Sequence, residues 1–449
     1  MGMLRYALLN IKKDLKNNSI YVFAIVISFI TVLMVLNCFT NATYFEGVDT
    51  VIVDESQNEI VQLDAKLQFF IEEPTLLHGQ NFLILFLVVL IFTYFCNSYF
   101  IKNKGKEFAF FTLNGATLGD RVKYIMFENS IFFLIGGAIG TVLGFIFVPL
   151  SNILMYSISG HWGDIWTINF YMFKYTLLVF LFEFGLLALL NLGDVYRREP
   201  VELLNLNNNK SQIDSRHVKV PNIVFVILFL IPIIFAIFWG NTQGAEYAVY
   251  VLSFGGLFGL YGIIKYFVPS IGKKLSRMSF TYKGLRKIYI GNFISTLRGS
   301  LYFILGLVLS LLYYSMITVR YSIVEGAISS SLYCYVITSM LVGLALLYKT
   351  IVEWERKIKE YRQLKILGYS KEEIINIIYK ENILFFGVGL MLPVILLLSN
   401  FIVYIIAGYF SSLFSLFLII SAVGPITIIG ILATIRNKNK IIKEIYPVE

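Results

Sequence analysis

The residues that could carry out chemistry in this chain are few and lie far apart. His78, His161 and His217 fall on three separate connections, so their spacing does not suit a metal site. No Gly-x-x-x-x-Gly-Lys-Ser/Thr phosphate loop occurs, and no Gly-x-Ser-x-Gly or Cys/His arrangement supports nucleophilic catalysis. The sequence therefore predicts a chain that is not itself an enzyme, holds no metal and does not hydrolyse ATP through such a loop.

The carboxylates concentrate in one stretch, residues 41–80, where eight acids stand against one Lys and leave a net charge of −7. One interpretation is a solubilising cap. The other is an electrostatic collector for a cationic ligand. On the second interpretation, the possible ligand-contacting residues include Glu46, Asp49, Asp54 and Glu55.

A single carboxylate interrupts the apolar run at 171–193. Glu183 lies in its middle, where an ionised side chain would cost several kcal/mol unless it is paired, protonated or hydrated. We expect Glu183 to face the interior of a helix bundle. It is either a protonated carboxyl that hydrogen-bonds to a neighbouring helix or a group with a ligand or proton role.

The elements that position these residues are set by the composition. Of 449 residues, 57% are hydrophobic and 14% charged, which excludes an ordinary soluble globular domain. Runs long enough to cross a bilayer as helices predict an all-α membrane protein with ten spans. They lie near residues 20–40, 81–101, 130–157, 171–193, 221–240, 247–268, 300–318, 331–349, 383–408 and 411–435.

The basic residues orient these spans. With both termini in the cytoplasm, 34 of the 37 Lys and Arg fall on cytoplasmic segments, leaving Lys66, Lys174 and Arg320 outside. This bias accounts for the pI of 9.1 without a nucleic-acid partner.

An internal repeat appears at a constant offset of 253 residues. Residues 107–117 align with 360–370 without a gap, and Glu128-Asn129 falls on Glu381-Asn382 where the chain enters the membrane. Spans 1–4 and 7–10 are therefore two copies in one orientation, joined by spans 5 and 6. The predicted divisions are residues 1–205, 206–283 and 284–449. Within the third span, Gly136, Gly140 and Gly144 share one face and predict close helix contact.

Each copy predicts a cytoplasmic helix, a tight turn and a second helix. A glycine ends the first helix, a hydroxyl residue caps the next, and an acid three positions later completes a capping box. This arrangement would couple a soluble partner to the membrane helices, although a helix resting on lipid headgroups is the alternative. The predicted coupling residues are Glu107, Gly115, Thr117 and Asp120 in the first copy and Glu360, Gly368, Ser370 and Glu373 in the second.

These motifs resemble the permease domains of FtsX-like ABC transporter subunits. The shared features are the Leu113 to Thr117 and Ile366 to Ser370 turns, each followed by a Glu before a Gly-rich span, and an Arg197-x-x-Pro200-x-x-Leu203 tail. Ten spans with two such domains resemble the BceB-type permeases of antimicrobial-peptide resistance. Those permeases carry a large extracellular domain between spans 7 and 8, whereas about a dozen residues, 319–330, bridge these spans here.

The resemblance implies a permease in a bacterial plasma membrane, working with a separate ABC ATPase dimer that holds the ATP and Mg. It further implies an antimicrobial peptide or similar amphiphile as ligand, membrane lipid as a partner, and a possible sensor histidine kinase. Two other functions stay open: export of a self-made peptide or lipopeptide, and mechanical regulation of a cell-wall enzyme.

Overall fold

The predicted all-α architecture is confirmed. A computed structural model describes residues 19–40, 74–160, 162–168, 171–197, 221–275, 285–320 and 325–445. Ten of the helices in these ranges are long and apolar enough to cross a bilayer, and each overlaps one predicted span. Helices suit this solvent because every backbone polar group inside a span is satisfied within its own segment. The possible ligand residues Glu46, Asp49, Asp54 and Glu55, and the Pro200 tail, lie outside the described residues.

The chain divides into two compact units. Unit 1 comprises residues 1–216 together with 323–334, and unit 2 comprises residues 217–322 and 335–449. The long helix α15 (Glu325–Ile366) thus gives its first turns to unit 1 and the remainder to unit 2. Only four residues, 321–324, separate it from the preceding helix, in agreement with the predicted short connection.

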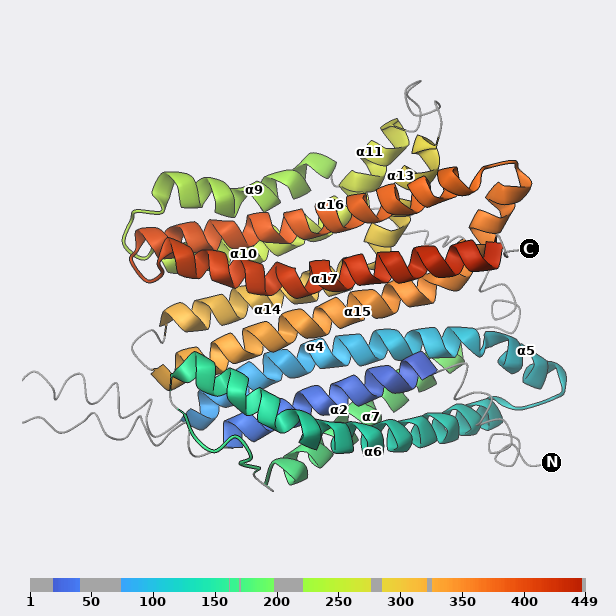
Figure 1. Cartoon of the computed structure of the whole chain (residues 1–449), viewed down its shortest axis with the longest axis horizontal. Helices are drawn as coiled ribbons and strands as arrows, with labels where there is room; N and C mark the ends of the chain where they lie inside the picture. Colours follow the sequence, from blue (N-terminus) through green and yellow to red (C-terminus); the bar gives the residue numbers. More distant parts are fainter. Residues whose placement is uncertain are drawn as a thin grey trace, which may run out of the picture. The chain divides into compact units, whose positions relative to one another are not determined.

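Unit 1 is built around its first helix. α2 (Ser19–Thr40) packs against three long helices, and a short helix, α5, follows the first of these three (Figure 1). These elements are α4 (Pro74–Asn103), α5 (Gly105–Leu113), α6 (Leu118–Ser159) and α7 (Tyr171–Arg197).

The predicted close contact of the third span is present between α2 and α6. A methyl group added at Gly136 would come within 2.7 Å of Ile25. At Gly140 it would come within 2.5 Å of Phe29 Cβ, closer than such contacts allow, and 3.0 Å from the carbonyl oxygen of Val26. The missing side chains on α6 therefore let the two helices approach closely, as small residues do in membrane bundles.

Unit 2 is centred on α16 (Lys371–Ile406). This helix packs against α9 (Asn222–Trp239), α10 (Ala245–Gly262), α13 (Arg286–Gly299), α14 (Leu301–Arg320) and α17 (Ser412–Ile445). A π-helical turn, η2 (Ile263–Phe267), leads from α10 into α11 (Val268–Leu275). The fifth and sixth spans, α9 and α10, belong to unit 2.

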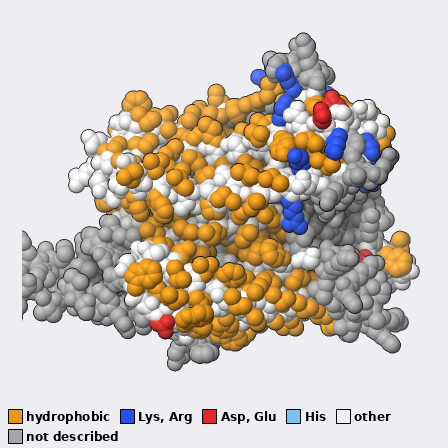
Figure 2. Space-filling view, in the orientation of Figure 1, with side chains coloured by type: hydrophobic (Ala, Val, Ile, Leu, Met, Phe, Trp, Pro, Cys, Tyr) orange, Lys and Arg blue, Asp and Glu red, His pale blue; other side chains and the backbone are white. Residues whose placement is uncertain are grey.

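The surface of unit 2 is apolar along its helices and basic toward one end. Figure 2 shows hydrophobic side chains over most of the visible helices, with Lys and Arg gathered near α11 and α13. Lys273 and Lys274 of α11 and Arg298 of α13 are exposed there. This separation is typical of a helix bundle whose sides face lipid and whose end meets water.

Buried polar side chains join helices inside both units. The Asn37 side-chain amide donates to Asn152 Oδ1 at 3.1 Å in unit 1, and Asn97 and Asn191 hydrogen-bond to each other. In unit 2, Asn400 donates to Ser253 Oγ at 2.8 Å. Such bonds fix helix register because an unmatched polar group would be left in an apolar interior.

Candidate functional site

The candidate site consists of two helix–turn–helix segments, one in each unit. Lever 1 is residues 104–129, formed by α5, its following turn and the start of α6. Lever 2 is residues 357–382, formed by the end of α15, a turn and the start of α16. The two ranges differ by the offset of 253 found in the sequence.

The turns have the predicted left-handed glycines. The φ angle is +80° at Gly115 and +94° at Gly368, a conformation that favours glycine because it has no Cβ. The amide after each glycine reaches back across the turn to a carbonyl in the last turn of the preceding helix. These bonds are Ala116 N to Phe111 O at 2.9 Å and Tyr369 N to Leu364 O at 3.1 Å.

Both predicted capping boxes are present. Thr117 Oγ1 accepts from the Asp120 amide at 3.3 Å, and the Asp120 carboxylate accepts from the Thr117 amide at 3.1 Å. Ser370 Oγ accepts from the Glu373 amide at 3.3 Å, and the Glu373 carboxylate accepts from the Ser370 amide at 2.9 Å. Reciprocal capping satisfies amides that the first helical turn leaves without partners, so each second helix has a fixed beginning.

The end of the first helix in each lever carries an exposed apolar side chain. Leu113 is 77% exposed in lever 1, and Ile366, its equivalent at the same offset, is 80% exposed in lever 2. Leu367 is exposed beside Ile366. We call Leu113 and Ile366 the lever tips.

A buried ion pair lies at the base of lever 1. Lys104 Nζ is 2.9 Å from the carboxylate of Glu128, and the two side chains are only 3% and 1% exposed. Lys104 also contacts Glu107 at 3.0 Å, and its ammonium lies 5.7 Å from the centre of the Tyr124 ring. The Tyr124 hydroxyl donates to Glu107 at 3.3 Å. The pair therefore joins the residue just before α5 to the third turn of α6.

Lever 2 has the equivalent pair, Lys357 with Glu381. Two hydroxyls donate to the Glu381 carboxylate at 3.2 Å, those of Tyr361 and of Thr296 on α13. Burial first, and then the negative charge of Glu381, raise the pKa of Tyr361 well above its usual value. The Tyr361 hydroxyl therefore keeps its proton at neutral pH and remains a donor.

The two lysines were missed by the sequence analysis, which named only their glutamate partners. A signal existed, because Lys104 and Lys357 obey the same 253-residue offset. A lysine beside a membrane span is common and by itself indicates only which side of the membrane the segment faces. Only the folded chain shows that each of these lysines pairs with a glutamate 24 residues further on.

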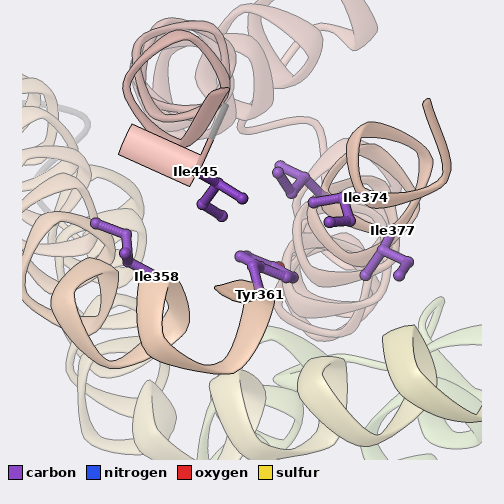
Figure 3. Close-up of a cluster of buried hydrophobic side chains, with 6 residues drawn as sticks. Ile358, Tyr361, Ile374, Ile377 and Ile445 are labelled. Carbon is purple, nitrogen blue, oxygen red and sulfur yellow. The ribbon is translucent and has the colours of Figure 1, made fainter. Parts of the chain in front are cut away.

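An apolar cluster stiffens lever 2. Ile358 and Tyr361 of α15 pack against Ile374 and Ile377 of α16, as Figure 3 shows. Ile445, at the end of α17, completes the cluster. The Lys365 ammonium donates to the Ile445 carbonyl oxygen at 2.7 Å and satisfies a helix-end acceptor. The end of α17 is thus part of this lever's support.

The two levers differ in how the first helix begins. α15 runs without interruption into lever 2, whereas α4 ends at Asn103 and α5 begins at Gly105. Gly105 occupies the position of Ile358, and glycine weakens a helix interior while isoleucine here is held by the apolar cluster. Lever 1 therefore has a separate first helix and lever 2 does not.

The remaining predicted residues occupy several environments. Glu107 contacts Lys104, whereas Glu360 is exposed. Asn129 is fully buried and accepts a hydrogen bond from Tyr21 at 2.5 Å, while Asn382 is half-buried. The structure thus brings Glu107 and Glu128 of lever 1 together around Lys104.

Glu183 faces the interior of unit 1, as predicted. It is fully buried on α7, and the Ser28 hydroxyl of α2 lies 3.3 Å and 3.2 Å from its two carboxylate oxygens. Nearby, the Phe29 and Phe180 rings stack at a centroid distance of 3.2 Å. In this conformation Glu183 joins two helices and is closed off from the surface.

Comparison with known proteins places these observations in a family context. Residues 82–200, which include lever 1, match the family described as FtsX-like permease C-terminal. Similar curated proteins include the bacitracin export permease protein BceB of Halalkalibacterium halodurans, 26% identical over 202 residues, or 44% of this chain and 28% of that protein. The protein of the same name in Bacillus subtilis is 30% identical over 158 residues, 35% of this chain and 21% of that one.

The aligned parts span less than a third of each curated relative. They confirm the resemblance to FtsX-like permeases that the motifs indicated. With the ten apolar helices, they indicate a multi-pass protein of the bacterial plasma membrane.

Proposed function

We propose that this chain is the permease subunit of an ABC transporter and that a separate ATPase, acting as a dimer, grips its two levers from the cytoplasm. ATP and Mg bind to the ATPase alone. Closure of that dimer tilts the membrane helices and acts on an antimicrobial peptide or similar amphiphile at the outer face, removing, inactivating or sensing it.

The observation that carries this proposal is the continuity between each tip and a membrane helix. Beyond its capping box, α6 continues to Ser159 and α16 continues to Ile406 as one helix. A force applied at Leu113 or Ile366 therefore crosses one short, hydrogen-bonded turn before it reaches a span. Two equivalent tips also suit a partner with two equivalent sites.

The cytoplasmic location of the levers is supported by charge. The 34 Lys and Arg assigned to that side include every basic residue of both levers. In unit 2, Lys371 is exposed beside the turn, and Figure 2 has the basic side chains at the end where α11 and α13 lie.

The proposed class of ligand is based on the similarity of this chain to the two curated relatives. The two curated relatives are named for the export of bacitracin. Bacitracin is therefore the first peptide to try, and other cationic or lipid-bound peptides follow, because the acidic stretch at 41–80 would attract them.

The levers are tested by charged substitutions at their tips. We expect the double variant Leu113→Asp with Ile366→Asp to lose co-purification with the partner ABC ATPase, because burying an aspartate in an apolar contact is unfavourable. The matched control is Asn376→Asp, an exposed position on α16 away from the tip. Equal recovery of the ATPase with both variants would contradict the proposed grip.

The ligand is tested on the complex in nanodiscs. Bacitracin should stimulate ATP hydrolysis by the wild-type complex and leave the complex of the tip variant at its basal rate. A panel of cationic and lipid-bound peptides without any stimulation would rule out the proposed ligand class while leaving the lever contact intact.

A further inference from the structure

We propose that the ion pairs Lys104–Glu128, which is buried, and Lys357–Glu381, in which only the glutamate is fully buried, are positioning pairs. They fix the angle between the two helices of each lever. This inference rests on the proposed function in one respect, namely that the levers transmit movement. Each pair lies at the base of its lever, away from the tip, and acts through the helices that it joins.

Each lever is held at two points. The capping box fixes the turn, and the ion pair lies about three helical turns further along the second helix. Two fixed points on each helix define an angle, whereas the turn alone would leave a hinge. Because the ion pair lies far from the turn, a fixed separation there restrains the angle between the two helices closely.

The chemistry of the pairs suits this role better than a purely stabilising one. Removing two charges from water costs several kcal/mol per ion, and their attraction offsets this cost only in a narrow geometry. Apolar contacts tolerate sliding, but a buried ammonium and carboxylate do not. A buried pair is therefore a weak source of stability and a strict constraint on helix position.

The lysine and the glutamate occur at equivalent positions of both levers, although the residues around them differ. This supports a role for the ion pair that does not depend on its neighbours. A tyrosine hydroxyl lies beside each pair, but it comes from α6 in lever 1 and from α15 in lever 2. At the equivalent positions, Tyr124 aligns with Ile377 and Tyr361 aligns with Phe108. Thr296 contacts the pair in lever 2, whereas Glu107 contacts it in lever 1. The lysine and glutamate are the common elements.

The test removes both charges and keeps the hydrogen bonds. In K357M/E381Q the methionine has nearly the length of lysine. Tyr361 and Thr296 donate to different oxygens of Glu381, so the amide oxygen of the new side chain accepts from one hydroxyl and its NH2 donates to the other. No unpaired charge stays buried, so we expect the variant to fold and to keep the wild-type melting temperature. The matched control is K380M, which removes one exposed positive charge from the same helix.

The first readout is the lever geometry and needs no ATPase. Spin labels at Gln363 and Asn376, exposed on α15 and α16, report the distance between the two helices. We expect one narrow distance distribution in the wild-type chain and in K380M, and a clearly broader one in K357M/E381Q. An unchanged distribution in a folded K357M/E381Q would overturn the positioning role.

The second readout is bacitracin-stimulated ATP hydrolysis by the complex in nanodiscs. We expect stimulation to fall about ten-fold in K357M/E381Q while the ATPase still co-purifies, since a misplaced lever binds without transmitting. A broad distance distribution with full stimulation would retain the positioning role but refute the lever as transmitter, and so would separate the two proposals. Full stimulation with a narrow distribution would overturn the inference alone.

Discussion

At the scale of single residues, the levers depend on a few conformations that only certain residue types adopt. Gly115 and Gly368 are the left-handed residues at the two turns, and each is followed by a hydroxyl that caps the next helix. An N-cap hydroxyl contributes about 1 kcal/mol, and replacing a left-handed glycine adds backbone strain. In each lever, therefore, neighbouring residues determine the turn in two ways: through the glycine and through the capping hydroxyl.

We expect Gly368→Ala to destabilise the chain by about 1–2 kcal/mol, because a Cβ is unfavourable in the left-handed region. Nothing lies within 4 Å of the added methyl, so the cost is purely conformational. Gly387→Ala on α16 is the control, since that glycine also has open space but lies within a regular helix. Thermal unfolding of the purified chain measures both, and equal stability of the two variants would contradict the assignment.

At the scale of helices, the contact between α2 and α6 depends on absent side chains. Gly136, Gly140 and Gly144 lie on the buried face of α6, against Ile25, Phe29 and Leu33 of α2. The hydrophobic effect contributes little to helix association within lipid. Close van der Waals packing must therefore supply the favourable free energy. This contact holds α6, whose first turns form the second helix of lever 1.

We expect Gly140→Ala to cost about 1–3 kcal/mol, the usual range for overpacking, because its methyl would meet Phe29 and the Val26 carbonyl oxygen. Gly185→Ala on α7, where nothing lies within 4 Å, should leave stability unchanged or slightly raised. Unfolding in a titration of a denaturing detergent compares them. If the first variant proved as stable as the second, the helices would not approach as described.

At the scale of the whole molecule, the arrangement across the bilayer decides whether the levers can meet an ATPase. The ten spans follow from composition, and the basic residues assign the side. In the predicted orientation, both levers lie on the side of the termini, and the connection between α6 and α7 lies on the opposite side. The proposed function requires this orientation.

Cysteine labelling in intact cells tests the orientation. Trp162→Cys, at a 68% exposed position between α6 and α7, should react with a membrane-impermeant thiol reagent from outside. Gln363→Cys on lever 2 should react only after lysis. The native Cys38, Cys96 and Cys334 are buried and give little background. Labelling of both positions from outside would reverse the orientation and remove the basis for ATP coupling.

The sequence by itself determined the ten helices, the two capped turns and the close-packed glycines. These features are local: a span needs about twenty apolar residues, and a capping box needs two residues three positions apart. They could be predicted because their partners are neighbours in the chain or the lipid itself.

Only the tertiary structure decided which polar groups meet. Glu128 and Glu381 are predicted from the sequence as residues near the membrane, but their lysine partners lie just before α5 and on α15. Likewise Glu183 was expected to face inward, whereas its contact with Ser28 depends on how α2 and α7 pack. Such pairings follow from the rotation and depth of whole helices, which no short stretch of sequence specifies.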